Sequence, residues 1–184
     1  MVKLRDFNIK NAKTHFKWNN DEELNYFDSD FPLIPESFES FISRLSLITA
    51  KENKINQLLE IHEANLGILI GVVDIHNIDL HNHHCSIECS IADLEYRHQG
   101  YGTAALKKAL RYCFEELDMK KVNAASFDFN KKWIKILNKL YFRQEGILRK
   151  HAIKNGVYAD KLLFGLLKEE YMQNRSQKVA VGAE

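Results

Sequence analysis

The chain has 184 residues, of which 45% are hydrophobic and 28% charged, and its formal net charge is +1. This length suits a single domain, and the even charge argues against proteins that coat nucleic acid, which carry a clear basic excess. The sequence has no run of about 18 apolar residues and no apolar signal-peptide core, so we expect a cytoplasmic protein without a membrane partner. Three cysteines without a C-x-x-C pair, Cys85, Cys89 and Cys113, favour reduced thiols.

The N-terminal half predicts a strand, two helices and three further strands. The expected elements, in chain order, are a strand at 3–7, helices at 11–27 and 36–48, two strands within 57–79 and a strand at 85–92. Pro32 and Pro35 separate the two helices, and a tight turn near residues 63–65 joins the paired strands. Helices therefore precede an antiparallel series of strands.

The C-terminal half alternates helices and strands. The expected elements are a helix at 102–118, a strand at 121–127, a helix at about 130–140, and strands at 144–153 and 157–167. Asn155 and Gly156 tolerate the positive φ of a type I′ turn, which indicates a hairpin between the last two strands. Residues 172–184 show no periodicity, so we expect one domain over 1–171 and a mobile C-terminal tail. The mixed order predicts an α+β (mixed α/β) domain with a central, mostly antiparallel twisted sheet flanked by helices.

The stretch "RHQGYG" at 97–102 places Gly100 and Gly102 where a predicted strand meets a predicted helix. Glycine permits positive φ and close approach, and the first amides of a helix have no partner within it, so this turn can bind an anion. The alternative is a tight turn with a structural role only. A P-loop is excluded because Thr103, not lysine, follows Gly102, and a dinucleotide fold because "KKVNAASF" lacks the acid that binds ribose.

The region around this turn is basic. Residues 97–143 contain eleven Lys and Arg against four Asp and Glu, a local charge of +7. A polyanion would be attracted to such a surface. Many of these lysines can equally form solvated helix faces, which is the interpretation that we prefer for Lys107, Lys108 and Lys135.

Segments from most of the chain resemble the GNAT superfamily acetyltransferases, in the ribosomal-protein N-acetyltransferase (RimJ/RimL-like) branch. The segments that carry the resemblance are "FKWNNDEELNYF", "GVVDIHNID", "RHQGYGTAAL", "FDFNKKWIKILNKLYF" and "NGVYADKLLFGLL". They follow the order that the family shows. The resemblance implies the GNAT fold and an acetyl-CoA-dependent N-acetyltransferase, in which an amine attacks the acetyl thioester directly.

The resemblance also implies coenzyme A, in the form of acetyl-CoA, as the anion at the turn. The amides from His98 to Gly102 would bind the pyrophosphate, Arg97 would open the turn, and the helix that starts at Asn130 would contact the pantetheine arm. The strand before the turn would separate from its neighbour and offer a backbone amide to the thioester carbonyl. The expected cofactor contacts are Ile91, Arg97, His98, Gln99, Gly100, Tyr101, Gly102, Thr103, Asn130, Trp133 and Lys139.

The expected catalytic residues are Glu88, Ser86 and His76. Relatives often carry a glutamate at the position of Ser86, whereas Glu88 lies two residues further on the same strand face, a shift of about 6.6 Å that waters could bridge. Glu88 is therefore the candidate general base, and a glutamate on a solvated sheet face is the alternative. Leu137 stands where many relatives have a proton-donating tyrosine, so thiolate protonation is left to water or another tyrosine. Tyr141 replaces a family glycine and Trp133 a small residue, and both changes alter the local contacts that the resemblance implies for coenzyme A.

Four histidines crowd near Cys85 in the stretch "HNIDLHNHHCS". Zinc needs converging ligands, and neighbouring residues of a hairpin point to opposite faces, so we expect a polar hairpin and no metal. His76 and Asp79 could still face the acceptor pocket.

The acceptor is expected to be an amine. Residues 19–41 contain seven acids and no Lys or Arg, and relatives use this segment as the wall of the acceptor site. An acidic wall suits a cationic acceptor, whereas a solvated acidic surface is the alternative. The leading interpretation is acetylation of a primary amine, either a protein or peptide N-terminus or a small amine. The alternatives are a polyamine or amino-sugar acetyltransferase and a catalytically weak CoA-binding sensor or partner module; a homodimer is a further expectation.

Overall fold

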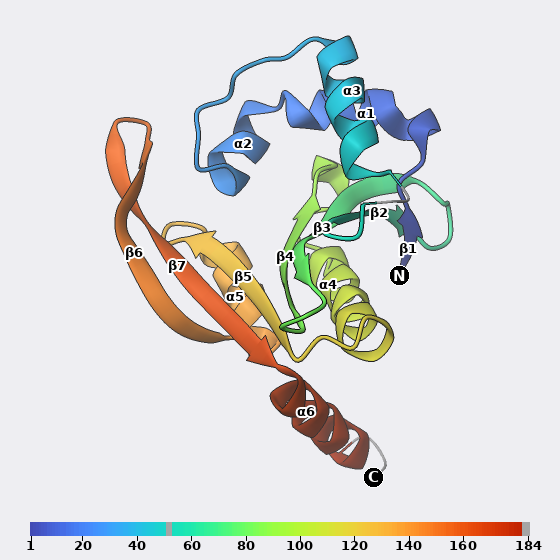
Figure 1. The fold of residues 1–184 in the computed structure, drawn as a ribbon, viewed down its shortest axis with the longest axis vertical. Helices are drawn as coiled ribbons and strands as arrows, with labels where there is room; N and C mark the ends of the chain where they lie inside the picture. Colours follow the sequence, from blue (N-terminus) through green and yellow to red (C-terminus); the bar gives the residue numbers. More distant parts are fainter. Residues whose placement is uncertain (51–52, 182–184) are drawn as a thin grey trace.

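The computed structural model describes residues 1–50 and 53–181. The strands in these ranges are β1 (Val2–Asp6), β2 (Gln57–Glu63), β3 (Leu69–Asp79), β4 (His84–Ile91), β5 (Lys121–Phe127), β6 (Arg143–Lys154) and β7 (Val157–Leu167). The helices are α1 (Ala12–Asn19), α2 (Glu22–Asp28), α3 (Phe38–Ile48), α4 (Tyr101–Arg111), α5 (Lys131–Lys139) and α6 (Lys168–Val181), with short helical turns at Ile9–Asn11, Leu94–Tyr96 and Tyr112–Glu116. Helices therefore flank a sheet, as Figure 1 shows.

One seven-stranded sheet runs in the order β1-β2-β3-β4-β5-β7-β6. Every neighbouring pair is antiparallel except β4 and β5, which are parallel. The predicted fold class, a mixed domain with a mostly antiparallel sheet, is confirmed. None of the helices in the described part of the chain is long and apolar enough to cross a membrane.

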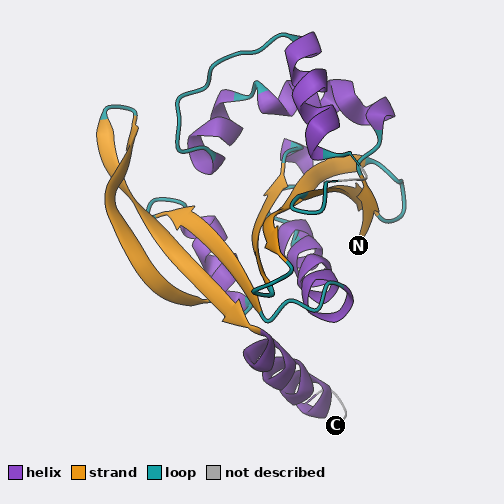
Figure 2. Cartoon of the chain, in the orientation of Figure 1, coloured by secondary structure: helices purple, strands orange, loops and turns teal. Residues whose placement is uncertain are grey.

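The pairing of β4 with β5 is short. Only three residue pairs join the two strands, ending with Ser86 opposite Asn123. Beyond that point the strands diverge, and Figure 2 shows the sheet opening into two halves toward α1, α2 and α3. The backbone groups along the inner edges of β4 and β5 are therefore not used by the sheet in this opening.

The segment predicted as one helix over 11–27 forms two. The prediction was wrong because Asp21 interrupts the helix: its backbone is extended, and its side chain accepts a hydrogen bond from the Leu24 amide at 2.9 Å, which caps a new helix. The interruption turns α2 toward the open end of the sheet (Figure 1).

A buried carboxylate fixes α1 on β2. Glu60 is 1% exposed and accepts hydrogen bonds from the Asn8 amide (3.1 Å) and the Asn11 side chain (2.8 Å). Its oxygens also lie 3.0 Å from Nε2 of His15 and 2.9 Å from Nε2 of His62. Burial opposes ionisation of Glu60, but these hydrogen bonds outweigh it and lower its pKa to about 2. The network thus holds a charged group inside the fold.

The core lies between the sheet and α4. Ala105, Leu106, Ala109 and Leu110 are all buried on one face of α4, and each leucine gains about 1.5–3 kcal/mol from that burial. The helix was predicted to continue to residue 118; it instead changes to a π turn over Tyr112–Glu116. The core packing fixes the start of α4 relative to β4.

The turn between β6 and β7 was predicted correctly, whereas the helix α6 was not predicted. Asn155 and Gly156 both have positive φ, 49° and 78°, so the predicted β6–β7 hairpin turn is confirmed. The prediction of no regular element over 172–184 was wrong as far as Val181, because α6 begins at Lys168 and stacks Tyr171 on Phe114 at 4.8 Å. Residues 182–184 lie outside the described residues, and the mobility of this end stays a prediction.

Candidate active site

The glycine turn presents free amides at the start of α4. Gly100 has φ of 86°, and α4 has no side-chain cap at its N-terminus. A Cβ added at Gly100 would meet nothing within 4 Å, whereas one at Gly102 would touch Ile91 and Ile136 at 3.6 and 3.7 Å. Glycine is therefore favoured at Gly100 by its positive φ, whereas a Cβ at Gly102 would make only ordinary van der Waals contacts. His98 adds a second positive φ, 64°, to the same turn.

A cavity of about 470 Å³ lies over this turn. Its lining includes these predicted cofactor contacts: Ile91, Arg97, His98, Gly100, Gly102, Thr103, Asn130, Trp133 and Lys139. Gln99 and Tyr101 are not in the lining, because the Gln99 side chain donates to the Glu95 carbonyl and the Tyr101 ring packs on Tyr96 at 5.6 Å. The glycine turn and α5 thus line one concave surface.

Two lysines on α5 extend this surface beyond the predicted set. Lys132 and Lys135 line the same cavity as Lys139, although we preferred a solvated face for Lys135. A signal was present in the sequence, because positions three and seven residues apart fall on one face of a helix. Cations on this face would favour an anion at the α4 N-terminus.

Arg97 ties three elements together at the mouth of the cavity. Its Nε donates to the Ile91 carbonyl at the end of β4, and an NH group donates to the Glu23 carboxylate on α2, both at 2.8 Å. The side chain therefore positions the turn against β4 and α2, a role that the sequence did not indicate.

Asn130 and Trp133 form the wall opposite β4. The Asn130 side chain caps α5 by accepting from the Trp133 amide at 3.2 Å. The Trp133 indole donates to the Ala125 carbonyl on β5 at 2.9 Å. The indole thus satisfies a backbone group on the β5 edge that diverges from β4.

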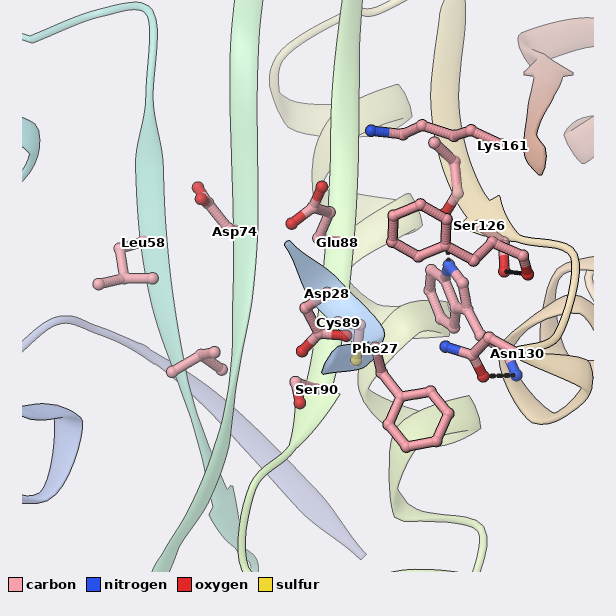
Figure 3. A pocket seen from close by; sticks show the side chains of 14 residues that line it. Phe27, Asp28, Leu58, Asp74, Glu88, Cys89, Ser90, Ser126, Asn130 and Lys161 are labelled. Atoms are coloured by element: carbon pink, nitrogen blue, oxygen red, sulfur yellow. Dashed lines mark hydrogen bonds between the residues drawn. The ribbon is translucent and has the colours of Figure 1, made fainter. Parts of the chain in front are cut away.

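A second cavity of about 230 Å³ adjoins the first and shares Asp28, Cys89 and Trp133 with it. Figure 3 shows carboxyl groups entering it from three elements: Asp74 on β3, Glu88 on β4 and Asp28 at the end of α2. Asp74 and Glu88 lie directly opposite one another in the β3–β4 register. The amine of Lys161 reaches the same cavity from β7 (Figure 3).

The cavity raises the pKa of all three carboxyl groups. Half of the Glu88 side chain is exposed, and it lines the second and third cavities. Desolvation there first, and then the Asp74 charge, raises its pKa to about 7, while the Lys161 charge opposes the shift. Asp28 is exposed by surface area but lies in the wall of both cavities. Desolvation by the surrounding protein, and then the Glu88 charge, raises its pKa to about 7. Burial raises the pKa of Asp74, whose buried Oδ1 has no hydrogen-bond partner within the described residues.

The predicted catalytic residues lie on the face that the alternation indicated. Cys85 and Ile87 are fully buried in the core, whereas Glu88 is on the open face of β4. His76 lies with its Nε2 3.8 Å from a Glu88 oxygen, and Ser86 is paired opposite His76. Both line a third cavity of about 260 Å³ that also contains Glu88, so Glu88 stands between the second and third cavities.

The structure shows the surroundings of Leu137 and the backbone conformation of Tyr141, two positions at which the chain departs from its relatives. Leu137 is completely buried in the core and offers no proton. Tyr141 has φ of 67°, which explains why relatives place glycine there. Over residues 1–50 and 53–181, no group of three His, Cys, Asp or Glu side chains could hold a metal ion; in the histidine-rich hairpin, His84 lies 3.6 Å from Asp79.

The glycine turn, the divergent strands β4 and β5 and the mixed sheet are the features expected of the GNAT fold. Comparison with known families agrees with this expectation. Residues 2–143 match the family described as Acetyltransferase (GNAT) domain. The chain therefore belongs to the GNAT acetyltransferase family.

Relatives from Bacillus subtilis (strain 168) share parts of the sequence. The SPbeta prophage-derived uncharacterized N-acetyltransferase YokL is 31% identical over 106 residues, which are 58% of this chain and 59% of YokL. The protein named "Putative ribosomal N-acetyltransferase YdaF" is 33% identical over 105 residues, 57% of each chain. This chain thus spans less than two thirds of the length of these two relatives. N-acetyltransferase YoaA is 25% identical over 167 residues, 90% of this chain and 92% of YoaA.

Solved structures share the fold. A spermidine N-acetyltransferase from Vibrio cholerae, in complex with CoA and spermine, superposes with a TM-score of 0.84 at 21% identity, covering 93% of this chain and 98% of that one. A dodecameric structure of a spermidine N-acetyltransferase from the same organism has a TM-score of 0.79 at 21% identity, covering 94% and 97%. At these identities the likeness establishes the architecture.

Proposed function

We propose that the protein is an acetyl-CoA-dependent N-acetyltransferase that acts in the cytoplasm on a small amine carrying more than one positive charge. The observation that carries this proposal is the second cavity, where Asp28, Asp74 and Glu88 converge beside the first cavity. A cavity with several carboxyl groups attracts a cationic acceptor. The fold likeness to a spermidine N-acetyltransferase supports the same acceptor class.

The first cavity fits acetyl-CoA. The α4 N-terminus has uncapped amides, the space above Gly100 is open, and Lys132, Lys135 and Lys139 line the opposite wall. Together these groups would hold the pyrophosphate, and Trp133 would border the pantetheine arm. Acetyl-CoA would supply the activated acetyl group when bound.

Glu88 would act as the general base. An acceptor amine arrives mainly as an ammonium ion, and it must lose a proton before its nitrogen can form the new C–N bond. The C–S bond would then break, and the thiolate would leave and take a proton from water or a tyrosine. A base with a pKa near the working pH is well suited to this step, and the pKa of Glu88 is about 7. His76, 3.8 Å from Glu88, would pass the proton toward the third cavity and solvent. Ser86 would line that exit.

A protein or peptide N-terminus is the second candidate acceptor, favoured by the 33% identity to the relative YdaF. This candidate would place the protein in the RimJ/RimL-like branch. One panel separates the two: purified protein and acetyl-CoA are mixed with putrescine, spermidine, spermine, glucosamine and short peptides, and thiol release is followed. We expect the highest kcat/KM with a polyamine. Turnover only with peptides would exclude the first candidate, and no turnover with CoA binding intact would favour a sensor module.

The homodimer expected from the resemblance is also a proposal. A fold neighbour forms a dodecamer, so light scattering of the purified protein, with and without polyamine, would decide between these assemblies.

A further inference from the structure

The carboxyl end of α2 is held by a buried lysine from the β6–β7 hairpin. Lys154 is 8% exposed, and its ammonium donates hydrogen bonds to the backbone carbonyls of Asn25 (3.4 Å) and Ser29. The same ammonium lies 4.9 Å from the centre of the Phe127 ring and 5.7 Å from that of Tyr26. The Asn25 carbonyl also accepts from the Ser29 amide at 3.0 Å, so Lys154 is its second donor. A cation at the carboxyl end of a helix is favourable.

This contact matters because α2 has little stability of its own. It contains seven residues, far fewer than the roughly 12–15 that an isolated helix needs in water. A neighbouring tie holds the chain just beyond it, where Lys161 pairs with Asp30 at 2.6 Å and His151 lies 3.4 Å from the same carboxylate. The position of α2 therefore depends on the β6–β7 hairpin.

The last residue of α2 is Asp28, which lines both the first and the second cavity. Lys154 lines neither of them. An effect of Lys154 on the acceptor is therefore indirect. It can act through the placement of the Asp28 carboxylate, through the lysine charge, which lowers the pKa of Asp28, or through the ring of Phe127, which lines the second cavity.

We propose that Lys154 is a positioning residue for the acceptor: by clamping the carbonyls of Asn25 and Ser29, it holds Asp28 over the second cavity. This inference rests on the proposed function, because it takes the second cavity as the acceptor site. Without the ammonium, the Ser29 carbonyl loses the lysine donor and the Asn25 carbonyl keeps only the Ser29 amide at 3.0 Å, so the end of α2 moves more freely. Acceptor binding then weakens, while Glu88 and the glycine turn stay in place.

The kinetic test uses Lys154→Met, which keeps an unbranched side chain one atom shorter than lysine and removes its donors. A charged hydrogen bond lost in full corresponds to about 10- to 100-fold in an equilibrium constant. We expect the KM for the best polyamine to rise about tenfold, kcat to stay within about twofold, and the thermal shift caused by CoA to be unchanged. Lys150→Met is the matched control, because Lys150 lies on the same strand, is exposed and contacts the Tyr158 ring instead. It should behave as the wild type.

A second measurement does not depend on turnover. Hydrogen exchange followed by mass spectrometry should show faster exchange of the α2 amides in Lys154→Met, with β5 and α4 unchanged and Lys150→Met identical to the wild type. Unchanged α2 exchange would overturn the clamp, and faster exchange with a wild-type KM would overturn its role in acceptor binding. If the wild type acetylates no amine, the proposed function fails, while the exchange result still decides the clamp. Should Lys154→Met fold poorly, Lys154→Gln keeps one amide donor and should give an intermediate KM; a wild-type KM in that variant counts against the proposal.

Discussion

Replacement of Glu88 by glutamine is the most direct test of the proposed chemistry. The substitution keeps the shape of the side chain and removes its ability to accept a proton. General bases contribute about 10²- to 10⁴-fold to a rate, so kcat/KM at pH 7 should fall by at least about 10²-fold. Binding of CoA should not change, because Glu88 does not line the first cavity.

The pKa of Glu88 also fixes the expected pH profile of the wild type. With a pKa of about 7, the carboxyl group is about one-tenth ionised at pH 6, about half ionised at pH 7 and about nine-tenths ionised at pH 8. Since only the carboxylate can accept a proton, kcat/KM should rise about fivefold from pH 6 to 7 and about twofold more by pH 8. In Glu88→Gln this inflection should disappear, and the defect should shrink as the pH approaches the pKa of the amine.

The assay is thiol release at saturating acetyl-CoA between pH 6 and 10, with spermidine or the best amine of the panel. His76→Asn serves as a companion variant, because it leaves the Glu88 carboxylate in place and should give a smaller defect. Normal turnover by Glu88→Gln at pH 7 would refute the assignment of the base. The same pH inflection in both proteins would show that another group produces it.

Three further predictions concern positions with well-defined environments. Gly100→Val should abolish the stabilisation by CoA, which would be about 2.7 kcal/mol at a hundredfold excess over Kd, because φ is 86° at this position. A thermal shift with CoA equal to that of the wild type would show that the turn has only a structural role. Gly71→Ala should lower the free energy of unfolding in urea by about 3 kcal/mol, because its Cβ would lie 2.1 Å from the Ser90 carbonyl oxygen; wild-type stability would contradict this clash. The pKa of Glu60 falls from 4.5 to about 2 on folding. The ionised carboxylate therefore stabilises the fold by about 3 kcal/mol above pH 4.5, and this contribution should be lost as the pH falls through 2. In urea titrations, the free energies of unfolding of the wild type and Glu60→Gln should converge at acid pH.

The strands, the hairpin and the glycine turn were predictable because their signals are local. Asn155 and Gly156 carry the conformational preference of their turn, and alternation along β4 places Glu88 on the open face. These properties depend on neighbours two or three residues away. The cap that splits α1 from α2 was also local, since Asp21 followed by acids is an N-terminal signal, but the apolar spacing on both sides hid it.

The composition of the second cavity was not predictable. Asp74 faces Glu88 only because of the register between β3 and β4, and one residue of slip would turn it to the other face. Asp28 reaches the cavity only because Lys154 and Arg97 hold α2 in place. Both depend on contacts between residues that are distant in the sequence, which no local pattern specifies.

Helix α2, which supplies Phe27 and Asp28 to the acceptor cavity, lies with α1 and α3 within a single connection of the sheet. β1 pairs with β2 from Val2 opposite Glu63 to Asp6 opposite Leu59. The residues between Asp6 and Leu59 therefore form one loop that this pairing closes. The entropy of closing a loop grows slowly, by about 0.6 kcal/mol for each doubling of its length. The length of this connection can therefore change at little cost to the pairing that closes it, provided that the contacts of Glu60 with Asn8, Asn11 and His15 are kept. The acceptor wall can change over evolution while the remaining strands and the glycine turn keep their stability.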